Sequence, residues 1–202
     1  MAQHLDFFFF YGSTYTYLTV MRIEKLAEAA GVTVRWRPIN LRQIMIEMDN
    51  IPFAKKPVKA RYMWRDLERR ARKHGIPFVQ QPVYPVEPDL LASRVGVVAA
   101  EQGWCPEYTK ETYRAWFLEN KGAGMGNNVE EALSALGKDP HEIIGLANSD
   151  RIKERLQAET DAAKALGVFG SPTFAVGDEI FWGDDRLEEA LDWCRSAQPQ
   201  AA

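Results

Sequence analysis

Cysteine and histidine are scarce in this chain of 202 residues, which has two cysteines and three histidines. Cys105 and Cys194 stand far apart, so they form neither a C-x-x-C redox pair nor a cysteine-rich zinc site. The histidines are equally scattered, at His4, His74 and His141, with no partner at metal-binding or general-base spacing. The sequence therefore carries no motif for disulfide exchange by its own cysteines and none for a metal.

Long apolar runs and a strong excess of one charge are also missing. The aromatic run Phe7–Tyr11 is far shorter than the ~20 apolar residues that span a bilayer, and it lacks the flanks of a secretory signal. The 25 basic and 28 acidic residues give a net charge of -3, which argues against nucleic acid or an anionic membrane as the main partner. We therefore expect a cytoplasmic protein that binds neither.

The chain does contain enough apolar residues, 46%, for a sizeable core, and its length allows one domain or one domain with a large insertion. Leu5–Tyr11 is nearly continuous and aromatic, the pattern of a strand that is covered on both faces. After a break at Gly12, apolar residues recur at helical spacing over 17–29, and Gly31 ends that helix. Val32–Trp36 then alternates as a second strand, so this order predicts a βαβ unit with parallel strands.

The middle of the chain has a helical pattern throughout. The spacing of its apolar residues predicts helices over 57–74, 90–102, 107–120, 129–136, 140–148 and about 150–166. Ser149 or Asp150 is expected to cap the last of these helices, and Gly167 to end it. Between about residues 40 and 165 the only candidate for extended structure is Phe78–Val79.

A β-hairpin and a helix close the predicted order of elements. Thr173–Val176 and Glu179–Trp182 are typical of two short strands around Gly177–Asp178, and Arg186–Cys194 of a final helix. The order βαβ, helical block, α, ββα is that of an α/β, thioredoxin-like fold with a large all-helical insertion. The predicted division is a discontinuous thioredoxin-like domain, residues 1–40 plus 160–202, and an inserted helical domain, residues 41–159.

In such a fold, chemistry is expected where the first strand meets the first helix. Unpaired backbone N–H groups and the positive end of the helix dipole favour a thiolate there. Redox members of the fold place C-x-x-C at this point, whereas this chain has Ser-Thr-Tyr-Thr at residues 13–16. The Ser13 hydroxyl therefore has two compatible interpretations: a helix N-cap, or a donor to a sulfur that a ligand supplies.

The segment 170–173, Gly-Ser-Pro-Thr, is the second candidate site. A cis Ser171–Pro172 bond would be a rare feature, and it would turn the backbone N–H and C=O of Ser171 toward the helix-start pocket. An extended peptide can pair with such groups as an added strand would. An ordinary turn proline is the alternative.

Four stretches of the chain together carry a resemblance. They are residues 6–18, 50–67, 167–174 and 181–187. These stretches include Asp-Phe-Phe-Phe, Asn-Ile-Pro-Phe, Gly-Val-Phe-Gly-Ser-Pro-Thr-Phe and Phe-Trp-Gly-Asp-Asp-Arg-Leu, and the last is quite specific. In these motifs the chain resembles 2-hydroxychromene-2-carboxylate isomerases and kappa-class glutathione transferases, a DsbA-like branch of the thioredoxin superfamily. The motifs occur in the family's order and run over nearly the whole chain.

The resemblance implies that the Ser13 hydroxyl donates a hydrogen bond to the sulfur of bound glutathione. The other positions that it assigns to glutathione are Asn50, Pro52, Lys59, Ser171, Pro172, Asp184 and Asp185.

Three of these assignments are chemically distinct. Lys59 would be the cation for the glycyl carboxylate, Ser171 would present its backbone to the cysteinyl part, and Asp184 with Asp185 would hold the γ-glutamyl end. Glutathione carries an ammonium and two carboxylates, so it needs partners of both signs. The alternatives are a solvated helix lysine for Lys59 and a helix cap for either aspartate.

Thr14 departs from the family, which usually has proline directly after the serine. Proline at this position fixes φ and contributes no donor, so threonine is expected to preserve the helix start and to add a hydroxyl near the thiol.

The function that the resemblance implies is glutathione-dependent isomerisation of 2-hydroxychromene-2-carboxylate to trans-o-hydroxybenzylidenepyruvate in aromatic catabolism, by transient addition of the glutathione thiolate. The expected partners are glutathione, a small aromatic substrate and a second copy of the chain in a homodimer. A kappa-like glutathione transferase and a non-catalytic thioredoxin-fold module that binds peptides or thiols are the alternatives.

Overall fold

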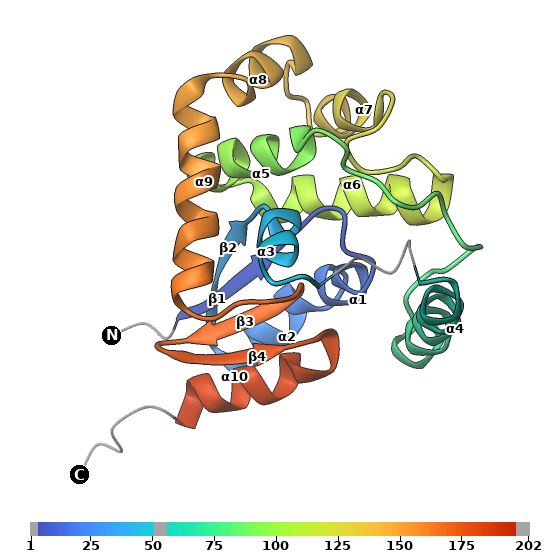
Figure 1. Cartoon of the computed structure of the whole chain (residues 1–202), viewed down its shortest axis with the longest axis vertical. Helices are drawn as coiled ribbons and strands as arrows, with labels where there is room; N and C mark the ends of the chain where they lie inside the picture. The colour runs from blue at the N-terminus through green and yellow to red at the C-terminus, as the bar shows by residue number, and fades with distance from the viewer. Residues whose placement is uncertain (1–3, 51–55, 197–202) are drawn as a thin grey trace.

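The computed structural model describes residues 4–50 and 56–196, and Figure 1 shows the arrangement of its elements. A four-stranded sheet in the order β2-β1-β3-β4 lies at the centre. Strands β1 and β2 are parallel, β3 runs antiparallel to β1, and β4 runs antiparallel to β3. The strands are β1 (His4–Phe9), β2 (Thr33–Pro38), β3 (Thr173–Val176) and β4 (Glu179–Trp182). Their order and directions confirm the predicted thioredoxin-like sheet.

Helices make up most of the rest of the described chain. They are α1 (Thr16–Val20), α2 (Ile23–Ala30), α3 (Leu41–Glu47), α4 (Pro57–His74), α5 (Leu91–Gln102), α6 (Cys105–Glu119), α7 (Asn128–Ala135), α8 (Pro140–Ala147), α9 (Asp150–Ala165), the 3₁₀ turn η2 (Asp184–Arg186) and α10 (Leu187–Ser196). Figure 1 shows α5 to α8 stacked on one side of the sheet, α9 running along it, and α4 standing apart beside α1. The predicted helical insertion is confirmed, while its division from the sheet domain at residues 40 and 160 stays a prediction.

Three sequence expectations differ from the structure. The first helix is broken at Met21–Arg22, because the Arg22 side chain turns back to the Leu18 carbonyl and across to Asp184. Helix α3 is absent from the sequence prediction; Asn40 is its N-cap, and the Asn40 side chain accepts a hydrogen bond from Gln43 N at 3.3 Å. Phe78–Val79 forms no strand among the described residues, and the Phe78 ring packs against Phe117 instead.

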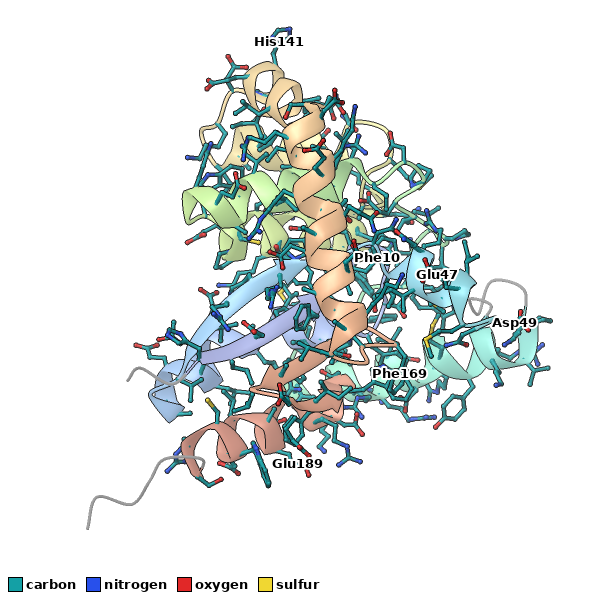
Figure 2. The ribbon with its side chains drawn as sticks, turned by 60° about the vertical axis from the view of Figure 1, so that its left-hand side comes forward. Phe10, Glu47, Asp49, His141, Phe169 and Glu189 are labelled. Carbon is teal, nitrogen blue, oxygen red and sulfur yellow. The ribbon has the colours of Figure 1, made fainter. Side chains whose placement is uncertain are left out.

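The aromatic strand β1 is buried on both faces, as its sequence predicts. Phe7 and Phe9 belong to a large core cluster that continues through α5, α6 and α7. Phe8 and Phe10 face a second cluster, which includes Ile44 of α3 and residues of α9 and the segment after it. Figure 2 shows Phe10 beside α9, where the sheet meets the helices above it. The end of β1 is thereby fixed from both sides, immediately before Ser13.

Candidate active site

Ser13 lies in the turn between β1 and α1. Its backbone N–H donates to the Phe10 carbonyl at 2.9 Å, and its hydroxyl donates to the Ser171 carbonyl at 2.8 Å. The first backbone hydrogen bond of the helix runs from Tyr17 N to Thr14 O, and Tyr15 occupies the N-cap position without a side-chain bond. The Ser13 hydroxyl therefore does not cap the helix but points to the loop before β3.

The loop before β3 meets the Ser13 turn as predicted. The Ser171–Pro172 peptide bond is cis, and Pro172 is buried at the start of β3. The Ser171 hydroxyl accepts a hydrogen bond from Phe10 N at 3.0 Å and lies 2.8 Å from the Thr16 hydroxyl oxygen. Ser171 is thus bound through its backbone carbonyl by the Ser13 hydroxyl and through its side chain by Phe10 N and the Thr16 hydroxyl.

Thr14 preserves the helix start, since its carbonyl accepts the hydrogen bond from Tyr17 N. Its side chain is buried and donates to the sulfur of Met63 on α4 at 3.1 Å. The hydroxyl that threonine brings in place of proline is therefore directed toward α4.

Asp184 and Asp185 have very different surroundings. Asp184 is 2% exposed; its Oδ1 accepts from Arg22 at 3.0 Å and its Oδ2 from Nε of Arg70 at 2.9 Å. Asp185 is exposed, and its nearest cation is Arg186 at 3.9 Å. Among the described residues, no backbone N–H donates to either carboxylate, so neither aspartate has the helix-cap role. The Asp184 carboxylate is occupied by two guanidinium groups, and the Asp185 carboxylate is accessible.

Of the remaining predicted contacts, the structure describes Asn50 and Lys59. Asn50 follows α3 and is exposed, with its N–H donating to Met45 O at 2.8 Å. Lys59 is exposed in the first turn of α4 and makes no ion pair with the described residues. Pro52 lies outside the described residues. The structure brings Ser13, Ser171 and Pro172 together, and it records no hydrogen bond from Asn50 or Lys59 to that group.

Three polar neighbours of the site were not predicted. The Tyr113 hydroxyl of α6 donates to the carbonyls of Phe10 and Ser13, at 2.9 and 3.1 Å. The Tyr15 hydroxyl donates to Asp66 of α4 at 3.1 Å, and burial, with Asp66 next, raises the pKa of Tyr15. Arg70 binds Asp184 as described above. No local sequence pattern identifies these residues, because each forms its hydrogen bonds with residues far away in the sequence.

The chain's two thiol groups lie outside this site. Cys105 and Cys194 are both free and buried, and burial raises the pKa of the Cys105 thiol to about 12. Among the described residues, no group of histidine, cysteine and acidic side chains could hold a metal ion. His141 lies at the end of the molecule remote from the hairpin (Figure 2).

None of the helices within residues 4–50 and 56–196 combines the length and the apolar character needed to span a bilayer.

A cavity of about 810 Å³ lies elsewhere, along the outer edge of β2. Most of its charged side chains are paired with one another or with neighbours, as in Arg35 with Asp6 and Arg37 with Glu159. None of the predicted site residues lines it, so it is separate from the Ser13 site.

Comparisons with known proteins agree with this fold. The family model of the DSBA-like thioredoxin domain matches residues 4–192. A 2-hydroxychromene-2-carboxylate isomerase of Pseudomonas sp. (strain C18) is 30% identical over 190 residues, which are 91% of this chain and 86% of that protein. Glutathione S-transferase kappa 1 of Caenorhabditis elegans is 26% identical over 208 residues, 96% of this chain and 92% of that protein.

A solved structure of 2-hydroxychromene-2-carboxylate isomerase superimposes with a TM-score of 0.84 at 29% identity, covering 96% of this chain and 97% of that one. The chain therefore belongs to the DSBA-like thioredoxin domain family, in the branch of the 2-hydroxychromene-2-carboxylate isomerases and kappa-class glutathione transferases.

Proposed function

We propose that this protein is a glutathione-dependent isomerase that interconverts 2-hydroxychromene-2-carboxylate and trans-o-hydroxybenzylidenepyruvate in the breakdown of naphthalene-type aromatics. One observation carries the proposal: the Ser13 hydroxyl lies 2.8 Å from the Ser171 carbonyl, in a chain 29% identical over 186 residues to the 2-hydroxychromene-2-carboxylate isomerase of Pseudomonas putida. The site thus pairs a hydroxyl donor with a backbone acceptor, and the chain's cysteines lie elsewhere.

The pair fits the cysteinyl part of glutathione. A carbonyl oxygen has two lone pairs, so Ser171 O can accept an N–H from an extended peptide as an added strand would. The sulfur of the same cysteine then lies within reach of the Ser13 hydroxyl, which turns from Ser171 O to the sulfur. Ser13 would thereby hold the sulfur in its ionised form.

When bound, glutathione would supply the thiolate that adds to the unsaturated side chain and leaves it free to rotate before expulsion. A thiol with a pKa of ~8.5 is only about 3% ionised at pH 7. Lowering that pKa by ~2 requires that the thiolate be stabilised by about 2.7 kcal/mol. Helix α1 has five residues, so its dipole contributes little. A hydrogen bond to a charged group contributes about 1.5–3 kcal/mol, which makes Ser13 the main contributor.

The charged ends of glutathione have partners of both signs. Lys59 on α4 would bind the glycyl carboxylate, assisted by Asn50 and Pro52, and the carboxylates at 184 and 185 would serve the γ-glutamyl end. Because Arg22 and Arg70 occupy Asp184, the exposed Asp185 is the carboxylate available for the ammonium group.

Ser13→Ala tests the proposal. We expect the variant to bind glutathione but to lose the ultraviolet absorbance of the bound thiolate at neutral pH, and its isomerisation rate to fall by about 30-fold, the equivalent of about 2 kcal/mol. Ser134→Ala, at an exposed position on α7, is the matched control and should behave as wild type. Undiminished thiolate absorbance in Ser13→Ala would remove Ser13 from the mechanism.

A kappa-like glutathione transferase is the second candidate, favoured by the 26% identity to the kappa 1 enzyme. The same bound thiolate would attack an electrophile such as a halonitroarene. Retention on glutathione resin, followed by an isomerisation assay and a conjugation assay, separates the candidate functions. Binding with conjugation alone indicates the transferase, and failure to bind glutathione leaves a non-catalytic module that binds peptides.

A further inference from the structure

Tyr113 connects the helical insertion to the Ser13 turn. It lies on α6, is fully buried, and its hydroxyl donates to the carbonyls of Phe10 and Ser13, at 2.9 and 3.1 Å. These two carbonyls bracket the turn that carries Ser13. The insertion therefore makes a direct polar contact with the backbone of the site, 100 residues away in sequence.

The turn is held from its other side by the loop before β3. Phe10 N donates to the Ser171 hydroxyl at 3.0 Å, and Phe10 O accepts both Ser13 N and the Tyr113 hydroxyl. The peptide groups on either side of Phe10 are thus bonded to elements on opposite sides. Because Phe10 is fixed in this way, we infer that the direction of the Ser13 side chain depends on the Ser13 carbonyl, which Tyr113 binds.

Packing alone does not account for the Tyr113 hydroxyl. The ring stacks with those of Tyr11 and Tyr17, with centroids 6.1 and 6.3 Å apart, and a phenylalanine ring would make the same contacts. Burying a hydroxyl costs free energy unless it finds partners, and here those partners are the two carbonyls of the turn. The hydroxyl therefore acts on the Ser13 turn rather than on the core.

We propose that Tyr113 is a positioning residue, whose hydroxyl holds the Phe10–Ser13 turn so that the Ser13 hydroxyl faces the sulfur position beside Ser171. This inference rests on the proposed function for the identity of the sulfur ligand. The positioning of the turn is a property of the protein alone and is measurable without glutathione.

Tyr113→Phe removes only the hydroxyl, and Tyr108→Phe is its matched control. Tyr108 lies on the same helix and is equally buried, but its hydroxyl makes no hydrogen bond among the described residues. Amide hydrogen exchange reports on the turn, and the pH dependence of thiolate absorbance of bound glutathione reports on Ser13. Urea unfolding of both variants separates a local effect from a loss of overall stability.

In Tyr113→Phe we expect exchange at the Ser13 amide to accelerate about fivefold relative to Tyr108→Phe, and the pKa of the bound thiol to rise. A core role alone would change the unfolding midpoint without moving the thiol pKa. Unchanged exchange at Ser13, or faster exchange with an unchanged thiol pKa, would overturn the inference. If wild-type protein binds no glutathione, the proposed function fails, and the exchange comparison alone decides whether Tyr113 positions the turn.

Discussion

At the scale of single residues, Glu87 carries a carboxylate that no solvent reaches. It is 0% exposed, and its oxygens accept from the N–H groups of Ser93 at 2.7 Å and Ala92 at 3.2 Å, at the start of α5. A side chain at Gly124 would collide with this carboxylate, so glycine there provides the room for it. Burial raises the pKa of Glu87 to about 7, against the lowering effect of the two N–H groups and with a small contribution from Asp89.

This shift makes stability depend on pH in a defined window. Below about pH 4.5 Glu87 is protonated in both the folded and the unfolded chain. Between pH 4.5 and about 7, Glu87 ionises in the unfolded chain but stays protonated in the folded one. The contribution of Glu87 to the free energy of unfolding therefore declines as pH rises, by about 3 kcal/mol in all. We expect Glu87→Gln to weaken this decline in urea unfolding measured from pH 5 to pH 8.

Glu154→Gln, at an exposed position on α9, is the control and should keep the wild-type pH dependence. Burial lowers the pKa of His74, which contributes a slope of the opposite sign, so the difference between Glu87→Gln and wild type isolates Glu87. An identical pH dependence in Glu87→Gln and wild type would show that this carboxyl titrates at its ordinary pKa.

At the scale of elements, α4 is attached to the sheet domain by side-chain contacts. Asp184 joins Arg70 of α4 to Arg22 in the break between α1 and α2, Tyr15 binds Asp66, and Thr14 binds Met63. Figure 1 shows this helix beside α1 and away from the other helices of the insertion. The position of Lys59, in the first turn of α4, follows from these contacts.

Asp184→Asn should therefore affect mainly stability, and Asp185→Asn mainly glutathione binding. Removing the buried charge takes the carboxylate from Arg70 and leaves Arg22 with the exposed Glu188. We expect this to cost about 3 kcal/mol of unfolding free energy in urea. Asp185→Asn should change stability by less than about 0.5 kcal/mol but weaken glutathione binding, measured by calorimetry. Equal losses of stability in the two variants would contradict the assignment of these roles.

Most elements could be predicted because their signals are local. Gly75 and Gly103 follow helices in the left-handed conformation, the Ser149 side chain caps α9, and Gly177–Asp178 turns the hairpin as its sequence indicates. The break at Met21–Arg22 depends on Asp184, about 160 residues further on, and no window of sequence contains both.

The site residues also divide into those with a local sequence signal and those that depend on long-range contacts. Ser13, Ser171 and Pro172 were identified by motif, and the structure brings them together. The burial of Asp184 and the bonds of Tyr113 to Phe10 and Ser13 depend on tertiary packing, which composition and spacing do not encode.

At the scale of the whole molecule, one apolar core crosses the predicted domain division. The same cluster contains Phe7 of β1, Trp116 of α6 and Leu133 of α7. We therefore expect residues 1–40 and 160–202 to unfold together with residues 41–159, in one transition with coincident circular dichroism and tryptophan fluorescence curves. Two separate transitions would show that the insertion is an independent folding unit. The homodimer that the resemblance implies stays a prediction.

The hydrogen bond between Ser13 and Ser171 joins residues that are 158 positions apart. During synthesis on the ribosome, β1 can pair with β2 early, but its second edge waits for β3, which follows all of α3 to α9. Until then the nascent chain carries an unpaired, aromatic strand edge, which is prone to association with other chains. A chain that terminates early within the insertion would lack the Ser171 half of the thiol site as well as the partner that covers this edge.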